Sequence, residues 1–273
     1  MDRCRDDYPV RLMCRCLRVS PSGYYECRGR RPGIRSQENE RLSERIQALH
    51  GQSDGVMGSP RIWKDLRYEG ETCGRHRVAR LMRLLNLRGI PQKRRIRRAL
   101  PGQRPQGIQN HLDRDFTAAA PNTKWATDIT YVRTQEGWLY LCVVIDLYSG
   151  SVVRWSMSAN QDRHMVIQAV LMALWQKPTQ DAVILHSDRG CQFTSCEYQR
   201  FLTGHNLVCS MSAVGSCADN AAVDGFFGFL KRERVYRRQY QNRAEARTDI
   251  FDYIERFHNL RMKRKMQVRK AMT

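Results

Sequence analysis

Two aspartates stand where a carboxylate is unusual in a folded chain. Asp128 lies inside the apolar and β-branched run from Trp125 to Tyr131, although aspartate is disfavoured in strands. Asp188 follows a short apolar run that ends at Leu185, and strand ends are where α/β folds place ligand chemistry. Because Mg²⁺ is usually held by one or two carboxylates together with substrate phosphates, the pair indicates a divalent-cation site. Either aspartate alone is also compatible with a capping or turn residue.

Asp224 is a third candidate carboxylate. Asn220 and Asp224 are four residues apart and share one face of a predicted helix, and Lys231 lies two turns beyond Asp224 on that face. Aromatic and apolar residues on the other side of this helix are expected to pack on a sheet. The alternative interpretation makes Asp219 the N-cap of the helix and leaves Asp224 as a solvated acid of its first turn.

The charge of the chain indicates a polyanionic partner. The 273 residues include 47 Lys and Arg against 27 Asp and Glu, a net charge of +20. Such a surplus favours nucleic acid, with an anionic membrane a distant second and a merely soluble basic protein as the plain alternative. Residues 1–114 hold 26 of the basic but only 12 of the acidic residues, so the positive charge is concentrated before the three aspartates.

Several classes of protein are excluded by composition. The first seven residues are mostly charged and precede no apolar stretch, and the longest apolar run, Trp138 to Ile145, is eight residues long. Neither a secretory signal nor a membrane helix is therefore expected. Without a secretory signal the ten cysteines are expected to be reduced thiols, and because they contain no Cys-x-x-Cys pair a structural zinc site is not expected. We expect a cytoplasmic protein with no membrane partner.

The second half of the chain has the element order of an RNase H-like fold. Three β-rich runs are followed by a helix, a strand, a helix and a final strand. Their expected positions are 127–133, 138–145, 151–157, 165–175, 182–185, 197–202 and 207–211. We therefore predict an α/β catalytic core over residues 115–273, with a five-stranded mixed sheet, flanking helices and a basic C-terminal helix.

The first half is predicted to be all-α. Helical spacing over residues 35–90, with Ser36 and Ser59 as expected caps, indicates a helix-turn-helix domain. Its second short helix carries Arg77, Arg80 and Arg83 beside an apolar stripe, which predicts contact with DNA. The alternative is a small helical bundle whose arginines are only solvated.

Two further segments complete this basic half. Residues 1–34 are expected to form an earlier helical unit that is similar to a helix-turn-helix. Residues 91–114 are rich in Pro, Gly and basic residues, among them Lys93, Arg94 and Arg95, and have too few apolar residues to pack. We expect an extended linker that lies along phosphates; the alternative is a solvated tether.

From about residue 5 to 260 the chain resembles the second-frame protein of insertion-sequence transposases of the IS-three group. The core of this family is similar to retroviral integrases and carries a triad of acidic residues, Asp, Asp and Glu (DDE). Five of the strings that carry the resemblance are 58–62, 125–131, 137–141, 186–190 and 219–227. The 35 residues between Asp188 and Asp224 match the family spacing of the second and third acids, and Lys231 matches its basic residue.

The resemblance implies a mechanism and partners. Asp128, Asp188 and Asp224 would hold two Mg²⁺ ions about 4 Å apart, with Mn²⁺ able to substitute. Water would nick the element end, and the freed 3′-hydroxyl would then attack target or donor DNA. Lys231 would contact phosphate near the scissile bond. The implied partners are terminal inverted repeats, target DNA, further copies of the chain and a first-frame protein fused by frameshifting, in a nucleoid-associated setting.

One departure puts the activity of this copy in question. The family's third acid is glutamate, whereas Asp224 is shorter by one carbon–carbon bond, about 1.5 Å. Because Mg²⁺ demands near-ideal octahedral geometry, this retraction predicts a weak enzyme, and the alternative function is a catalytically silent protein that binds the inverted repeats. A nuclease acting on RNA–DNA hybrids is a third interpretation, against which the basic helical half and the whole-chain resemblance argue. The C-terminal tail also differs from that of many relatives.

Overall fold

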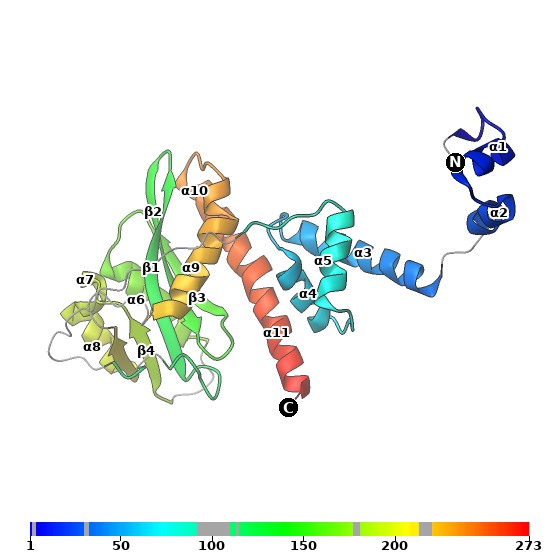
Figure 1. The fold of residues 1–273 in the computed structure, drawn as a ribbon. Coiled ribbons are helices and arrows are strands. Elements are labelled where there is room, and N and C mark those ends of the chain that lie inside the picture. The colour runs from blue at the N-terminus through cyan, green and yellow to red at the C-terminus, as the bar shows by residue number, and fades with distance from the viewer. Residues whose placement is uncertain are drawn as a thin grey trace.

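The computed structural model describes residues 1, 4–29, 33–91, 110–112, 115–176, 181–212 and 220–272. Figure 1 shows an α/β domain, a compact group of helices beside it, and the two N-terminal helices apart from both. The linker residues Lys93, Arg94 and Arg95 lie outside the described residues. Among the described residues no helix is both long and apolar enough to cross a membrane.

A five-stranded mixed sheet forms the centre of the α/β domain, as predicted. Its strands are β1 (Lys124–Thr134), β2 (Gly137–Asp146), β3 (Val152–Ser158), β4 (Val183–Ser187) and β5 (Leu207–Met211). The spatial order is β3-β2-β1-β4-β5, and β2 runs antiparallel to both β1 and β3. β4 runs parallel to β1 and to β5. The pairing of β4 with β1 covers only residues 124–126 of β1, so the rest of β1 extends beyond it.

Helices cover both faces of this sheet. They are α6 (Arg163–Leu174), α7 (Cys191–Thr194), α8 (Cys196–Gly204), α9 (Ala221–Glu233), the 3₁₀ turn η3 (Val235–Arg237) and α10 (Arg243–Asp252). Side chains alternate along β1: Trp125 packs with the residues of α6 and α8, and Ala126 and Val132 pack with those of α9 and α10. The apolar side of α9 buries Phe226 and Leu230 in the cluster that also contains Ala126 and Val132, as its sequence predicts.

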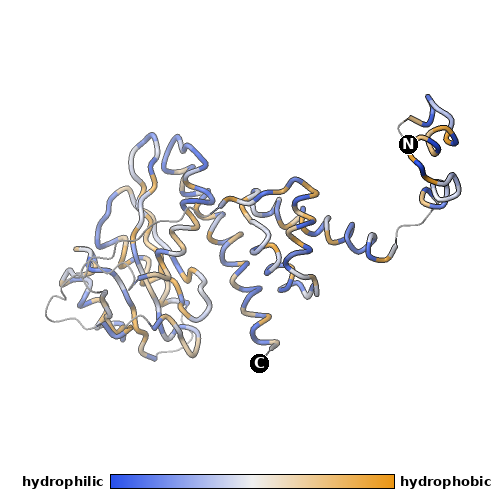
Figure 2. Tube along the Cα trace, viewed as in Figure 1, coloured by the Kyte–Doolittle hydropathy of each residue, from blue (hydrophilic) through white to orange (hydrophobic). Residues whose placement is uncertain are grey.

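The C-terminal segment is helical. α10 continues through a π-helical turn η4 (Tyr253–His258) into α11 (Asn259–Met272). α11 is largely hydrophilic along its length (Figure 2). It leaves the sheet and runs along the group of helices formed by residues 34–84 (Figure 1).

Three helices form the helix-turn-helix domain around one core. They are α3 (Ile34–Gln52), α4 (Ser59–Tyr68) and α5 (Arg75–Leu84), and their apolar faces share one buried cluster. The predicted caps are wrong: the N-caps are Gly33 and Gly58, and neither makes a side-chain cap hydrogen bond. Ser59 instead lies inside α4, because extended backbone at Gly58 (φ −87°, ψ 171°) leads directly into the helix.

The N-terminal unit has the predicted helices but little core. α1 (Val10–Leu17) buries only Cys14, and α2 (Pro21–Gly29) buries none of its residues. The apolar side chains of Leu12 and Leu17 are exposed. Two helices that bury so little are not held together by their own packing.

Candidate active site

The sheet places Asp128 and Asp188 side by side. β1 and β4 are parallel, with Ala126 paired with His186. Asp128 and Asp188 each lie two residues beyond that pair, Asp128 within β1 and Asp188 directly after the end of β4. Since adjacent strands are about 4.8 Å apart, the two carboxylates meet at one end of the β1–β4 pairing.

The electrostatics of Asp128 bring the other predicted residues into the same site. The pKa of Asp128 is raised to about 7, first by burial and then by the charges of Asp188 and Asp224. A hydrogen bond from the backbone N–H of Ile129 (2.7 Å) and the charge of Lys231 act in the opposite direction. Asp224 and Lys231 both come from α9. Three acids and one base, drawn from β1, the end of β4 and α9, therefore share one electrostatic environment.

Asn220 fastens α9 to β1. It is the N-cap of α9 and is only 4% exposed. Its side-chain amide donates to the backbone carbonyl of Thr127 over 3.3 Å, and its buried Oδ1 has no hydrogen-bond partner among the described residues. This contact fixes the start of α9, and hence Asp224 in its first turn, against the strand that carries Asp128. The spacing of Asn220 and Asp224 places both on one helix face, but nothing in the sequence indicates this bond.

The loop after β4 is held in place by backbone contacts. Asp188 Oδ1 accepts the N–H of Gly190 at 2.9 Å, and Arg189 donates to the carbonyl of Ser212. Ser212 in turn donates both its N–H and its hydroxyl to the carbonyl of Ser187 at 3.1 Å. One oxygen of Asp188 is thus committed to its own turn, which orients the carboxylate.

The donor atoms of this site suit a hard cation, but the side chains do not form a complete ligand set. Three carboxylates and the buried amide oxygen of Asn220 offer only oxygen, the ligand that Mg²⁺ prefers. Burial is the main cause of the raised pKa of Asp128, and repulsion from Asp188 and Asp224 adds to it; a bound cation would relieve that repulsion. Within the described residues, however, no three His, Cys, Asp or Glu side chains are grouped closely enough to hold a metal ion.

The predicted DNA-contacting arginines of α5 differ in their surroundings. Arg80 and Arg83 are exposed. Arg77 is half-buried and donates to Asn39 at 2.9 Å and to Glu38 at 2.8 Å, both on α3. The regular spacing of three residues predicts the same role for all three arginines, whereas in the fold Arg77 joins α5 to α3 within its own domain.

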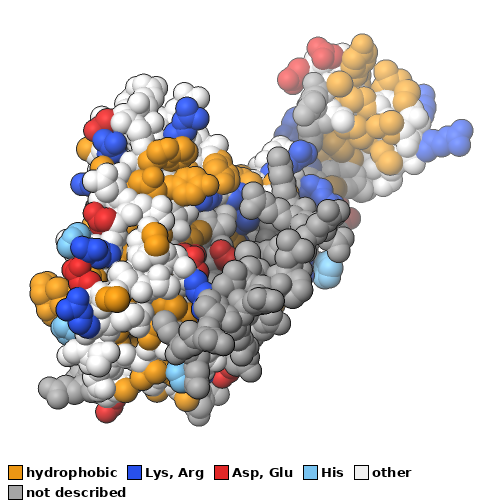
Figure 3. Space-filling model, turned by 90° about the vertical axis from the view of Figure 1, so that its left-hand side faces the viewer, with side chains coloured by type: hydrophobic (Ala, Val, Ile, Leu, Met, Phe, Trp, Pro, Cys, Tyr) orange, Lys and Arg blue, Asp and Glu red, His pale blue; other side chains and the backbone are white. Residues whose placement is uncertain are grey.

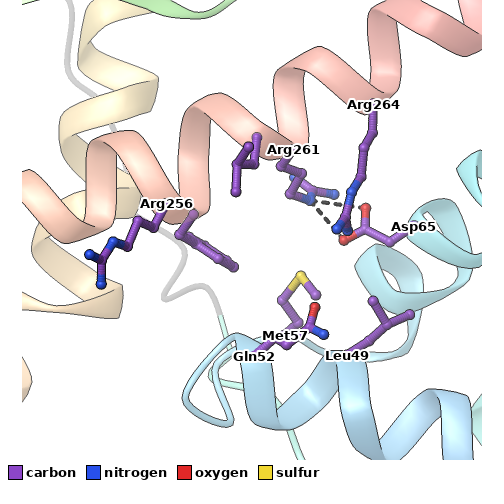
Figure 4. A pocket seen from close by; sticks show the side chains of 9 residues that line it. Leu49, Gln52, Met57, Asp65, Arg256, Arg261 and Arg264 are labelled. Atoms are coloured by element: carbon purple, nitrogen blue, oxygen red, sulfur yellow. Dashed lines mark hydrogen bonds and ion pairs between the residues drawn. The ribbon is translucent and has the colours of Figure 1, made fainter.

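The helix-turn-helix domain is attached to the α/β domain by buried charge pairs. Arg61 of α4 pairs with Glu233 of α9, which is 2% exposed. Asp65 of α4 accepts from Nε of Arg261 with both carboxylate oxygens at 3.0 Å. Figure 4 shows Arg261 reaching Asp65 beside a cavity of about 310 Å³ between α11 and this domain. Phe257 packs against the cores of both domains.

Comparison with known proteins identifies the family. Residues 37–95 match the model of an HTH-like domain, and residues 118–217 and 224–273 match two models of an integrase core domain. The chain is 40% identical over 259 residues to the transposase InsF for insertion sequence IS3A of Escherichia coli (strain K12), over 93% of this chain and 88% of that relative. The chain belongs to the IS3 family of insertion-sequence transposases.

Other similarities of this IS3-family transposase are more distant. It is 38% identical over 248 residues to the insertion element IS600 uncharacterized 31 kDa protein of Shigella sonnei, over 90% of this chain and 91% of that relative. Among solved structures, the HTLV-2 integrase catalytic core domain in complex with magnesium matches with a TM-score of 0.34 and 26% identity, over 41% of this chain and 70% of that one. The catalytic domain of Mos1 mariner transposase matches with a TM-score of 0.43 and 11% identity, over 52% and 75%.

Family membership confirms the predicted fold and class of activity. The transposase has an RNase H-like integrase core after a helix-turn-helix-like region. It is a polynucleotidyl transferase of the DDE type that belongs to DNA transposition. The matches to an HTH-like domain and to an integrase core domain likewise confirm the prediction that the chain binds DNA.

Proposed function

We propose that this transposase nicks the 3′ ends of its element and joins them to target DNA, with Asp128, Asp188 and Asp224 as the acidic triad. In the nicking step a water oxygen attacks the scissile phosphorus, and the bond to the 3′ oxygen breaks and leaves a 3′-hydroxyl. In the joining step that hydroxyl attacks a phosphodiester of the target, and the displaced 3′ oxygen takes up a proton. Neither step needs a covalent protein–DNA intermediate.

The chain's own residues supply position and charge in these steps. Asp128 and Asp188 lie at the level of the reacting phosphate, and Lys231 compensates the charge of a non-bridging phosphate oxygen. Asn220 keeps α9 in register with β1 so that Asp224 faces the same phosphate. The helix-turn-helix domain, with Arg80 and Arg83 exposed on α5, holds the terminal inverted repeat.

A divalent cation, Mg²⁺ or Mn²⁺, completes the proposed site. Asp128, Asp188 and Asp224 would hold it, two ions being the family's usual number, and when bound it would activate the attacking hydroxyl and stabilise the leaving oxygen. The acids would then ionise together, because the cation's charge offsets the repulsion among them.

The observation that carries this proposal is the parallel register of β1 and β4, which sets Asp128 and Asp188 side by side, and the raised pKa of Asp128 supports it. Asp188, Asp224 and Lys231, which are distant in sequence, all act on that one carboxylate. Perturbed carboxylates that gather with a base are typical of catalytic sites. Structural ion pairs also perturb pKa values. In a cluster of three acids and one base, however, pairing with the base does not account for the other acids.

The direct test is a nicking assay on a labelled duplex that contains the element's own terminal repeat. Asp128→Asn and Asp188→Asn should each abolish nicking in Mg²⁺ while binding of the repeat is unchanged. Asp162→Asn, at the N-cap of α6, is the matched control and should nick like the unmodified protein. Nicking by either triad variant at the unmodified rate would refute the assignment.

A second candidate function has its own observation. The third acid is the shortened Asp224. A retracted carboxylate favours a protein that occupies the inverted repeats without cutting them. In that case, unmodified protein would bind repeat DNA yet leave it intact in both Mg²⁺ and Mn²⁺.

Assembly belongs to the same proposal. An element has two ends, so joining both to one target calls for at least two copies of the chain on DNA. Fusion to a first-frame protein and association with the nucleoid follow from the family resemblance and from DNA as the partner.

We also propose that the chain is divided into four structural units, formed by residues 1–34, 35–90, 91–114 and 115–273.

A further inference from the structure

An exposed aromatic pair lies at the end of the β1–β2 hairpin. Tyr131 is 55% exposed and Trp138 is 44% exposed. Their rings meet edge to face, with centroids 5.2 Å apart. Figure 3 shows hydrophobic side chains gathered in the upper part of the catalytic domain, with Lys and Arg side chains beside them.

The topology of the sheet explains why this pair is uncovered. β4 pairs with β1 only through residues 124–126. Beyond them β1 pairs with β2 on one side, and on the other side the described residues show a single bridge, between Thr134 and Tyr240. Tyr131 is paired with Tyr140, and Arg133 with Trp138. Tyr131 and Arg133 are two residues apart on one strand, so these four side chains share one face. Tyr140 packs against the core, so two aromatic rings, Tyr131 and Trp138, and the cation of Arg133 are presented beyond the covered part of the sheet.

Lys231 connects this pair to the active site. Its Nζ lies 4.6 Å from the centroid of the Tyr131 ring, and its charge also acts on Asp128. Asp128 and Tyr131 are three residues apart on β1, about 10 Å along the strand, so their side chains leave opposite faces of the sheet. Lys231 belongs to α9, which packs on the Asp128 face, yet it contacts the Tyr131 ring. Through this cation the aromatic pair lies about one nucleotide's reach from the carboxylates.

We propose that Tyr131 and Trp138 form a stacking platform for one unpaired DNA base, that of a nucleotide next to the scissile phosphate. The inference rests on the proposed function, since it takes the scissile phosphate to lie at the three acids. A single-stranded nucleic acid is bound by aromatic rings that stack on bases and by cations that follow the backbone. The pair with Lys231 and Arg133 has both elements, and the net charge of +20 fits a polyanion.

The platform has a mechanistic use. A phosphodiester inside a duplex is constrained by pairing and stacking on both sides, and enzymes that act on DNA gain access by unstacking nucleotides at a cost of a few kcal/mol. A ring surface that receives the released base would offset part of that cost. The platform would then orient the terminal nucleotides, while Lys231 stays in contact with their phosphate.

The test uses the full-length chain in EDTA, so that no cleavage interferes. The probe is a terminal-repeat duplex with a short unpaired end and 2-aminopurine at the nucleotide on either side of the cleavage position. In the unmodified protein the 2-aminopurine should be quenched at one of these two positions. Trp138→Ala and Tyr131→Ala should restore its fluorescence and weaken binding of the unpaired end roughly 5- to 100-fold. Trp138→Phe and Tyr131→Phe should retain most of both.

The matched control is Trp175→Ala, another exposed tryptophan (76% exposed) at the C-cap of α6. It should leave quenching and affinity unchanged, and so should every variant when the repeat is fully paired. Equal quenching by Trp138→Ala and Trp175→Ala would overturn the platform. So would a loss of self-association in sedimentation of Trp138→Ala with DNA binding intact, because the pair would then be a contact between protein chains.

The same samples separate this inference from the proposed function. If the unmodified protein quenches the probe but never nicks in Mg²⁺ or Mn²⁺, the proposed chemistry fails and the platform stands. If it nicks normally while Trp138→Ala and Tyr131→Ala neither restore fluorescence nor weaken binding, the platform fails and the chemistry stands. Urea unfolding of each variant identifies any loss that comes from misfolding rather than from the missing ring.

Discussion

The side-chain amide of Asn220 donates a hydrogen bond to the backbone carbonyl of Thr127, the residue immediately before Asp128, over 3.3 Å. Residues 93 positions apart are thereby joined. The bond connects the N-cap of the helix that carries Asp224 to the strand that carries Asp128. The separation of the first and third acids therefore depends on a residue that is neither acidic nor basic.

Asn220→Ala should lower the nicking rate roughly 100-fold while binding of the terminal repeat stays within about twofold, since misplacement by about 1 Å can cost that much in rate. Asn220→Asp should be nearly as impaired, because a carboxylate cannot donate to the carbonyl of Thr127. The measurement is single-turnover nicking at several Mg²⁺ concentrations, where a displaced acid shifts the metal dependence as well as the rate.

Asn242 offers the matched control for this prediction. It is the N-cap of α10, and its side chain accepts the N–H of Glu245 at 2.8 Å. Asn242→Ala should cost about 1 kcal/mol of stability but leave the metal dependence of nicking unchanged. If Asn220→Ala behaves in the same way, Asn220 is only a helix cap.

Asp224→Glu should increase nicking and strand transfer, by roughly 100-fold if the shortened side chain misplaces its carboxylate by about 1 Å. The added methylene extends the carboxylate by about 1.5 Å, while the contact of Asn220 keeps α9 in place. The gain should be larger in Mg²⁺ than in Mn²⁺ if the strict geometry of Mg²⁺ limits the unmodified protein. Equal rates for the unmodified protein and Asp224→Glu in both ions would contradict this prediction. Asp181→Glu, at an exposed position, is the control for side-chain length.

Much of the catalytic domain could be predicted from the sequence because its strands are strongly patterned. The final strand was predicted at 207–211, and β5 occupies those residues. The first strand was expected to begin at residue 127, but β1 begins at Lys124. Residues 124–126 pair with β4, and residues 125 and 126 pair with β2 as well, so their strand conformation comes from partners distant in the sequence and not from a local pattern.

The site was only half predictable for the same reason. Asp128 and Asp188 could be identified from the sequence, because their positions within and directly after predicted strands are local features. The contact of Asn220 with Thr127 and the pair Arg61–Glu233, which spans 172 residues, depend on tertiary packing alone. Arg77 shows the converse, since its helical spacing with Arg80 and Arg83 gave no sign that it would bind Glu38 of its own domain.

Arg261→Ala should destabilise the attachment of the helix-turn-helix domain. Asp65 is 4% exposed and accepts from Arg261 with both carboxylate oxygens, so removal of the arginine leaves a buried charge unpaired. We expect a loss of about 1.5–3 kcal/mol in the free energy of unfolding, measured by urea denaturation. Limited proteolysis should detect the released domain at the same time.

A double-mutant cycle isolates the pair itself. Asp65→Ala with Arg261→Ala should be less destabilising than the two single changes added together, because no unpaired charge remains. Arg264→Ala is the control, as this arginine is 45% exposed and lies 3.9 Å from Glu69; it should cost at most about 1 kcal/mol. Additivity of the Asp65 and Arg261 changes would show that the two do not act as a pair.

His258 should make the stability of the catalytic domain sensitive to acid. Burial, together with the charges of Arg261 and Arg61, lowers the pKa of His258 to about 4, although its bond to Gly150 acts in the opposite direction. The neutral ring donates from Nε2 to the carbonyl of Gly150 at 3.0 Å and meets the ring of Phe226 edge to face. In the unfolded chain the pKa of histidine is about 6.5, so below that pH the unfolded state binds the extra proton. Stability should therefore be complete above about pH 6.5 and should fall toward about pH 4, by at most roughly 1.4 kcal/mol per pH unit.

Urea unfolding at pH 7, 5.5 and 4.5 measures this slope. His258→Gln should flatten it in that window, whereas His164→Gln, at an exposed position on α6, should not. An unchanged slope in His258→Gln would assign the acid sensitivity to other groups.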